Sequence, residues 1–178
     1  MSTIEIKKNS ITDLETDAIV NAANDGLWAG SGVCGAIFAA AGKRKLEEAC
    51  KKIGHCDTGS AVITPGFDLK ATYIIHAVGP IWESGKRDES KLLYGAYYHS
   101  LELAVENHCA SIGFPLISTG VFGYPIDQAW GVAIQACADF INKGNQIDIV
   151  FAVLKDSVIQ SGKNALMLIA PQLMKETS

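Results

Sequence analysis

Short runs of apolar residues, separated by segments with helical periodicity, most constrain the fold of this chain. Residues 17–23 (DAIVNAA) form a continuous apolar run, and residues 73–78 (YIIHAV) and 146–153 (QIDIVFAV) are also rich in apolar side chains. Such runs are typical of strands buried on both faces of a parallel sheet. Each run precedes a segment with helical character, so the sequence predicts an α/β protein with three α/β/α layers and a central mixed, mostly parallel sheet.

The remaining segments continue this alternation of strands and helices. Further strands are expected at residues 4–8, 60–64 and 111–117, and helices at residues 36–41, 43–52, about 90–107, 125–142 and 157–173. Because proline cannot donate to a β ladder, Pro115 predicts that its strand lies at a sheet edge or ends there. The polar segment at residues 82–90 predicts a mobile loop, with Asp88 or Ser90 capping the helix that follows.

Composition indicates one folded domain over residues 1–178. Of the 178 residues, 48% are hydrophobic and 19% are charged, which suits a single core without disulfide or metal cross-links. The N-terminus carries no signal-peptide pattern, and no apolar run approaches the ~20 residues that span a membrane. Five scattered cysteines, an odd number, favour a reducing compartment. We therefore expect a cytoplasmic protein that is a monomer and has no membrane attachment.

Charge and side-chain spacing disfavour two classes of ligand. The formal net charge of −4 disfavours nucleic acid, whose binding depends on neutralising phosphates. Histidine and cysteine stand next to each other at His55–Cys56 and His108–Cys109, whereas zinc sites space their ligands two or more residues apart. We therefore expect no nucleic acid, no metal and no cofactor. An anionic ligand would have to be held by backbone amides.

The stretch from Asn21 to Gly42 (NAANDGLWAGSGVCGAIFAAAG) is rich in small residues. It contains five glycines and seven alanines in 22 residues, although glycine loses more backbone entropy on folding than any other residue. This composition indicates that something other than side chains lies against the backbone. A second glycine-rich loop, STGVFG at residues 118–123, follows a later expected strand.

Both loops lead from a strand into an expected helix, which is where ligands bind in α/β sheets. Consecutive backbone N–H groups at the positive end of a helix bind phosphates. Neither Gly30–Gly35 nor Ser118–Gly123 contains lysine or arginine, and two such loops together suggest a diphosphate. Neither loop matches GxxxxGK[ST] or GxGxxG, so neither an NTPase nor a Rossmann oxidoreductase is supported. The alternative is that each loop is only a tight turn.

Asn24 is the candidate functional side chain of the first loop. It ends the apolar run, so its carboxamide is expected to point into the cleft, where it can donate to and accept from a sugar diol. The alternative is a plain turn at Asn24-Asp25-Gly26, since all three residue types favour turns. Asn21 is expected to be a buried amide that holds neighbouring backbone, and His76 a hydrogen-bonded core histidine.

Four segments, in this order, resemble the macrodomain family, whose members bind ADP-ribose. They are DAIVNAAN (residues 17–24), the glycine loop with GAIFAAAG (residues 35–42), YIIHAVGPIW (residues 73–82) and PLISTGVFGYP (residues 115–125). The resemblance covers essentially the whole chain. It implies that Asn24 hydrogen-bonds the distal ribose, that Phe122 packs against that sugar, and that the two glycine loops hold the diphosphate. The ligand-binding residues that it implies are Ser10, Ile11, Asn24, Gly32, Val33, Cys34, Gly35, Ala36, Ile37, Ser118, Thr119, Gly120, Val121 and Phe122.

This sequence departs from the family pattern at three positions. Ser10, which with Ile11 would meet the adenine, stands where most members have an aspartate that accepts from the adenine amino group. The hydrolytic, deacetylase-like members usually read GGGGVDGAIH, so Cys34 and Phe38 replace an aspartate and a histidine. Macrodomains of the alphavirus type resemble this chain in reading GVC, and that branch includes ADP-ribosyl hydrolases. Cys34 is then a small lining residue; the alternative is a nucleophile, because a helix N-terminus activates a thiol.

The resemblance implies an enzyme that binds ADP-ribose and hydrolyses ADP-ribosyl esters on protein Asp or Glu side chains, with O-acetyl-ADP-ribose as a related substrate. Asn24 and Cys34 are the candidate catalytic residues. The alternative function is a non-catalytic reader of ADP-ribose or of ADP-ribosylated proteins, which Ser10 and Cys34 both favour. A third hypothesis is a module for another nucleotide or for RNA. The sequence leaves open whether Trp28 closes over the cleft or only packs.

Overall fold

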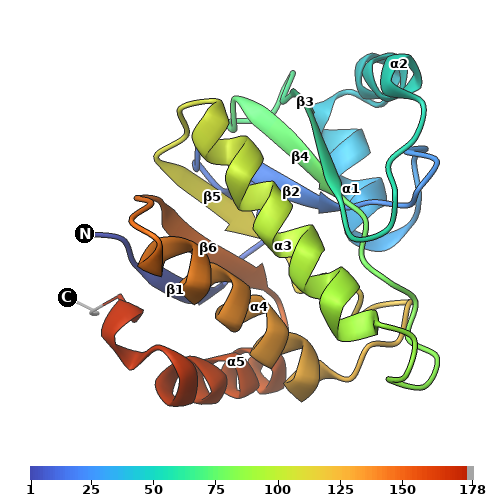
Figure 1. Ribbon diagram of the computed structural model, residues 1–178. Coiled ribbons are helices and arrows are strands. Elements are labelled where there is room, and N and C mark those ends of the chain that lie inside the picture. Colours follow the sequence, from blue (N-terminus) through green and yellow to red (C-terminus); the bar gives the residue numbers. More distant parts are fainter. Residues whose placement is uncertain (176–178) are drawn as a thin grey trace.

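A six-stranded sheet in the order β1-β6-β5-β2-β4-β3 runs through the centre of the computed structural model, which describes residues 1–175 (Figure 1). The strands are β1 (Ile4–Lys8), β2 (Ala18–Ala22), β3 (Ala61–Pro65), β4 (Tyr73–Ala77), β5 (Ser111–Phe114) and β6 (Asp148–Val153). Neighbouring strands are parallel except for β3 and β4, which are antiparallel. The expected mixed, mostly parallel sheet is confirmed.

Helices cover both faces of this sheet. They are α1 (Gly32–Ala41), α2 (Lys43–Ile53), α3 (Glu89–Glu106), α4 (Ile126–Asn142) and α5 (Asp156–Ile169), with the short 3-10 helices η1 (Ile11–Asp13) and η2 (Pro171–Leu173). Helices α3, α4 and α5 pack on one face, and α1, α2 and η1 on the other (Figure 1). The three-layer prediction is therefore confirmed. None of the helices in residues 1–175 is long and apolar enough to cross a membrane.

The central strand β2 shows why its sequence is apolar at every position except Asn21. Val20 belongs to the apolar cluster on the side of α3, α4 and α5, which also holds Trp130. Its neighbour Ile19 belongs to the cluster on the opposite side, which also holds Ile37 and Phe38. Successive side chains of a strand point to opposite faces, so a strand between two helical layers has no polar face.

The start of α1 and the end of β5 differ from the expected boundaries, the first at a glycine and the second at a proline. Helix α1 begins at Gly32 and not at residue 36, so the second half of the predicted glycine loop is the first turn of a helix. Strand β5 ends at Phe114, directly before Pro115, and it lies between β6 and β2. The strand-end interpretation of this proline is thus right and the edge interpretation is wrong. The last expected helix is divided at Ala170 into α5 and η2.

The expected cap of α3 is also wrong. Asp88 occupies the N-cap position with a φ of 60°, but its side chain makes no capping hydrogen bond, and Ser90 lies within the helix. The polar segment at residues 82–90, expected to be mobile, is instead anchored by the buried carboxylate of Glu89, which accepts hydrogen bonds from its backbone.

Candidate functional site

The predicted site residues lie on loops and at the starts of α1 and η1, at the edge of the sheet where the parallel strands β1, β2, β4 and β5 end. One backbone hydrogen bond and one close approach join the loops after β4 and β5. The N–H of Trp82, after β4, donates to the carbonyl of Phe122, after β5, at 2.8 Å. An ideal Cβ on Gly79 would lie 2.2 Å from Ser118 Oγ, so the two loops pack closely. The chain thus brings together segments from four separate parts of the sequence at the edge where α/β sheets bind ligands.

The side chain of Asn24 closes the first turn of the loop after β2. Its Nδ2 donates to the carbonyl of Trp28 at 2.9 Å, and its Oδ1 accepts from the N–H of Trp28 at 3.1 Å. The structure therefore contains the turn that was the alternative explanation for Asn24. A carboxamide has a second N–H and a second lone pair, and Asn24 also lines a cavity at this edge. The same group can close the turn and still bind a ligand.

Trp28 packs back on its own loop. An ideal Cβ at Gly26 would lie 1.6 Å from Trp28 Cζ3, so this glycine is required by the indole ring. Trp28 nevertheless remains 62% exposed. The ring both packs on Gly26 and offers a large apolar surface to solvent.

Only some glycines at this edge are explained by contacts inside the protein. A Cβ at Gly35 would lie 2.6 Å from the carbonyl oxygen of Gly30, and Gly32 has a φ of +60° that favours glycine. By contrast, a Cβ at Gly30 would make only ordinary contacts, the nearest at 3.6 Å to Cys34 Sγ, and one at Gly120 would meet nothing within 4 Å. At Gly30 and Gly120, no contact among the described residues accounts for the glycine.

Helix α1 presents its first turn, Gly32 to Gly35, at this edge. The first N–H groups of a helix have no partner within the helix and carry partial positive charge, which suits an anion. Ala36 is exposed and Ile37 is buried in the core beneath. The second loop differs, because α4 begins only at Ile126 and carries Asp127 in its first turn. A phosphate there would depend on the amides of the loop itself.

The second loop holds its shape through its own backbone. Tyr124 N–H donates to the carbonyl of Ser118 at 2.8 Å, and Thr119 Oγ1 donates to the carbonyl of Leu116 at 2.8 Å. Ser118 has a φ of 70°, and its buried Oγ has no hydrogen-bond partner among the described residues. Val121 at the tip is 94% exposed. The loop therefore offers backbone amides and an apolar tip.

Cys34 belongs to the first turn of α1, and among the described residues no base hydrogen-bonds its Sγ. It is 7% exposed, and its Sγ lies 3.6 Å from the donor Asn21 Nδ2 and 3.8 Å from the carbonyl of Trp28. Asn21 Nδ2 lies between Cys34 Sγ and the ring of His76. This surrounding suits a small lining residue better than an activated nucleophile.

Asn21 and His76 form a buried chain of hydrogen bonds. Asn21 Nδ2 donates to His76 Nδ1 at 3.1 Å, so Nε2 carries the proton and donates to Thr64 Oγ1 at 2.9 Å. Burial lowers the pKa of His76 to about 4, which keeps the ring neutral. Both residues are buried, as expected. Asn21 hydrogen-bonds side chains, however, whereas we predicted that it would hydrogen-bond neighbouring backbone.

Ser10 and Ile11 lie where β1 leads into η1, which packs against α1. Ile11 is buried, whereas Ser10 is half-exposed and its hydroxyl is 2.9 Å from Thr12 Oγ1. The N–H of Asn9 donates to the carbonyl of Val153, and the next residue, Leu154, is 66% exposed.

A cavity of about 330 Å³ opens beside Asn24 and Phe122. The other residues that line it are Asp25, Thr58, Val78, Gly79, Pro80, Ile81, Glu83, Arg87, Glu89 and Leu92. Apart from Asn24 and Phe122, none of the predicted site residues is in this lining. The cavity therefore adds a wall that the motifs did not reveal, made by the segment between β4 and α3.

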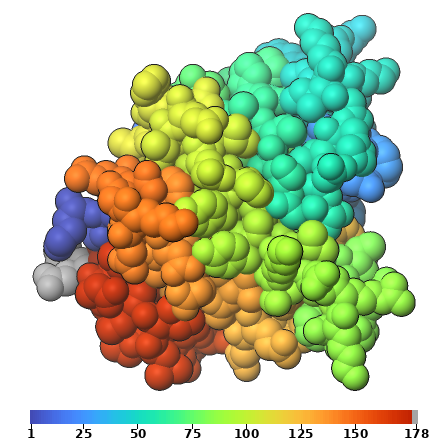
Figure 2. Space-filling model, in the orientation of Figure 1, coloured from blue at the N-terminus to red at the C-terminus, as the bar shows by residue number. Residues whose placement is uncertain are grey.

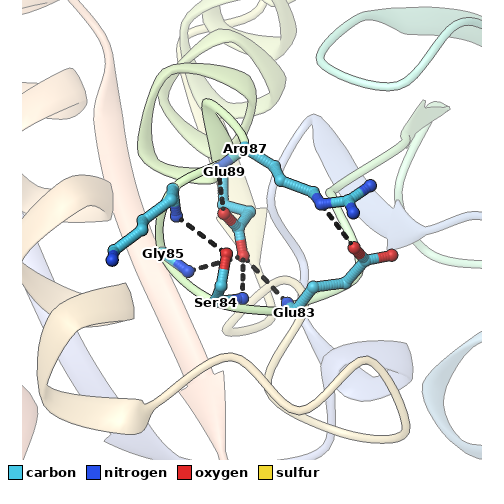
Figure 3. A network of polar contacts seen from close by, with 6 residues as sticks. Glu83, Ser84, Gly85, Arg87 and Glu89 are labelled. Atoms are coloured by element: carbon cyan, nitrogen blue, oxygen red, sulfur yellow. Dashed lines mark hydrogen bonds and ion pairs between the residues drawn. The ribbon is translucent and has the colours of Figure 1, made fainter.

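Glu89 shapes that wall (Figure 3). Its Oε2 accepts from the N–H groups of Glu83, Ser84 and Gly85 at 2.8, 3.1 and 3.0 Å, and its Oε1 accepts from that of Arg87 at 2.8 Å. These hydrogen bonds favour the ionised form and lower the pKa of Glu89 to about 2. The loop that they hold protrudes at the lower right of the molecule in Figures 1 and 2.

Comparison with known proteins identifies the family. The family model described as Macro domain matches residues 20–133. An O-acetyl-ADP-ribose deacetylase of Salmonella typhimurium is 48% identical over 159 residues, 87% of this chain and 88% of the relative. A macro domain-containing protein of Chlorobaculum tepidum is 47% identical over 160 residues, 89% of this chain and 92% of the relative. The solved structure of an Oceanobacillus iheyensis macrodomain with ADP is 36% identical, with a TM-score of 0.91 over 96% of this chain and 93% of that one. The chain belongs to the macro domain family.

Proposed function

We propose that this protein binds ADP-ribose and hydrolyses ADP-ribosyl esters: O-acetyl-ADP-ribose, and ADP-ribose carried on Asp or Glu side chains of proteins. One observation carries the proposal. The first turn of α1, the second glycine loop and the cavity at Asn24 and Phe122 lie at the same edge of the sheet. The deacetylase named above, at 48% identity, supports the ester chemistry.

The diphosphate would lie between the two glycine loops. Backbone N–H groups of the first turn of α1 would bind one phosphate, and the amides around Gly120 the other. Gly30 and Gly120, which no contact among the described residues requires, would let the backbone approach the phosphates. No lysine or arginine is present in either loop, so the charge would be balanced by amide dipoles.

The distal ribose would enter the cavity between Asn24 and Phe122. The free N–H and lone pair of Asn24 would hydrogen-bond the sugar diol, and the half-buried ring of Phe122 would pack against the sugar. At the other end, Ser10 and Ile11 would meet the adenine. Ser10 offers a hydroxyl where a carboxylate would form a stronger, charged hydrogen bond.

Hydrolysis would then proceed by attack of water on the positioned ester. For a glycosyl ester, the water oxygen bonds to the anomeric carbon, the bond from that carbon to the carboxyl oxygen breaks, and the carboxylate leaves while the water loses a proton. For an acetyl ester, water attacks the acyl carbon and the ribose hydroxyl leaves. Positioning of the sugar and water would supply most of the acceleration, with Asn24 as the orienting residue and Cys34 as a neighbour that lines the site.

The second candidate function is a reader that binds ADP-ribose or ADP-ribosylated protein without turnover. The specific observation behind it is Cys34, whose Sγ has no base in contact within the described structure. Turnover of O-acetyl-ADP-ribose, followed as acetate release, distinguishes the two. Tight ADP-ribose binding without acetate release would identify the reader, and acetate release that is lost in Asn24→Ala would identify the hydrolase.

The location of the protein, its oligomeric state and the absence of nucleic acid among its ligands remain predictions. A cytoplasmic location agrees with the five cysteines, all of them free thiols. A monomer and the absence of nucleic acid among the ligands remain expectations from charge and composition.

A further inference from the structure

We propose that the outer part of the cavity beside Asn24 is a subsite for the carboxyl group of the ester, and that Arg87 binds this group. This inference rests on the proposed function and adds the residue that recognises the acyl side of the substrate. The subsite is built by the segment between β4 and α3, which contributes Glu83, Arg87 and Glu89 to the lining.

The position of the cavity separates it from the site of the diphosphate. We call the part of its lining that Asn24 and Phe122 supply, where the distal ribose would lie, the inner part, and the part that Glu83, Arg87 and Glu89 supply the outer part. Of the two amide-lined segments, residues 32–37 and 118–123, only Phe122 is part of its lining. A group in the outer part is therefore attached to the sugar on the side away from the diphosphate, which is where the ester linkage leaves the ribose. Its 330 Å³ is at the small end of ligand cavities, enough for a sugar and a short acyl group.

The charge of the lining indicates what this part can hold. Among the described residues that line the cavity, Arg87 supplies the only cationic side chain. Hydrolysis of either ester, acetyl or glutamyl, produces a carboxylate, and a guanidinium matches a carboxylate with paired N–H donors. Arg87 Nε lies 2.9 Å from Glu83 Oε2, and the four N–H groups on its two Nη atoms remain for a ligand.

Arg87 is held in place from two sides (Figure 3). Glu89 Oε1 accepts from its backbone N–H at 2.8 Å, and Glu83 pairs with its side chain. Glu89 has its negative charge surrounded by four backbone N–H groups, so it competes little for the guanidinium. Asp25 is the remaining acidic residue of the lining. In this arrangement Glu89 is a positioning residue, and Arg87 is the group that contacts the substrate.

The size of the effect is limited by solvent. The side chain of Arg87 is 73% exposed and that of Glu83 is 52% exposed. An exposed ion pair contributes little, so we expect Arg87 to favour a carboxylate over a neutral group of the same shape by about fivefold in Kd. The preference should fall at high ionic strength, because exposed charges are screened.

The test compares two probes that cannot be hydrolysed. One is ADP-ribose with a carboxymethyl group joined to the anomeric carbon of the distal ribose by a carbon–carbon bond, and the other is the matching primary amide. Titration calorimetry gives the Kd of each probe, and of ADP-ribose, for wild type, Arg87→Gln and Arg87→Lys. Arg44→Gln is the control, because Arg44 on α2 also pairs with a glutamate four residues away, Glu48, and its side chain is 95% exposed, against 73% for Arg87.

We expect wild type and Arg44→Gln to prefer the carboxylate probe about fivefold. Arg87→Gln should lose this preference while keeping its affinity for ADP-ribose, and Arg87→Lys should recover part of it. Equal binding of both probes by wild type, or a preference that survives in Arg87→Gln, would overturn the inference. Failure to bind ADP-ribose itself would instead overturn the proposed function, so the two failures are distinguishable.

Discussion

Replacing Gly120 with alanine tests whether this glycine is needed for ligand binding or for the fold. An ideal Cβ at Gly120 meets no atom within 4 Å, and its φ lies outside the left-handed region. The methyl group therefore causes no clash in the free protein, and alanine restricts the unfolded chain. We expect the free energy of unfolding of Gly120→Ala to stay unchanged or to rise by up to about 1 kcal/mol.

The same methyl group should weaken ADP-ribose binding, because it would occupy the space through which a phosphate approaches the backbone. Loss of one hydrogen bond to a charged group corresponds to about 1.5–3 kcal/mol. This free energy corresponds to an increase of roughly 10- to 150-fold in Kd. Titration calorimetry measures the affinity, and thermal unfolding of the same preparation measures the stability.

Gly35→Ala provides the contrast. Its Cβ would lie 2.6 Å from the carbonyl oxygen of Gly30, so backbone must move. We expect this variant to lose about 1–3 kcal/mol of stability as well as affinity. If Gly120→Ala bound ADP-ribose as tightly as wild type, the diphosphate would not lie against this backbone, and the second loop would be only a turn.

Two further predictions concern the adenine end and the buried histidine. Ser10→Asp should lower the Kd for ADP-ribose about tenfold, because a charged hydrogen bond to the adenine amino group replaces a neutral one. The control is calorimetry with inosine diphosphate ribose, which lacks that amino group. An equal gain in affinity for both ligands would contradict the placement of Ser10 at the adenine. The pKa of His76 is depressed from 6.5 to about 4, so its contribution to stability is complete above pH 6.5 and is lost as the pH falls toward 4. Between pH 6.5 and pH 5 the free energy of unfolding should fall by about 2 kcal/mol. Urea denaturation at both pH values should show this fall in wild type and in His99→Gln, a control at an exposed histidine. If the free energy of unfolding of His76→Gln fell by the same amount, the fall would not be due to His76.

The sheet and its layers were predictable because they depend on hydrophobic patterning. Runs such as residues 17–23 and 73–78 have no polar face, and only a strand between two helical layers satisfies that pattern. The expected core role of His76 follows from the same reasoning, since a lone histidine within an apolar run must find hydrogen-bond partners when it is buried. Its partners Asn21 and Thr64 lie on neighbouring strands, and no local pattern reveals that register.

The start of α1 could not be predicted from local preference. Gly32 and Gly35 both disfavour helix, and the helix begins there because tertiary packing of Ile37 and Phe38 outweighs that preference. In the same way, Asp88 looked like a cap, while the carboxylate that organises the loop belongs to its neighbour Glu89. Glu89 accepts hydrogen bonds from four backbone N–H groups of the loop that precedes it. In the sequence, such a residue looks the same as any other acidic residue at a helix N-terminus.

The cavity was missed because it is assembled from distant segments. Asn24, Thr58, Gly79, Arg87 and Phe122 meet there only after the strands have paired. The motifs identified the two residues at its inner end. The outer wall comes from a polar loop whose composition indicated nothing beyond exposure to solvent.

Release of ADP-ribose from a protein that carries it on a glutamate side chain tests the central claim most directly. Wild type is compared with Asn24→Ala and with Asn24→Asp, which keeps the acceptor for Trp28 N–H but loses the amide donor. The proposed function predicts release by wild type and strongly reduced release by both variants, with thermal unfolding showing that they remain folded. No release above background by a wild-type protein that binds ADP-ribose would contradict hydrolysis of carboxylate-linked ADP-ribose and would identify a reader.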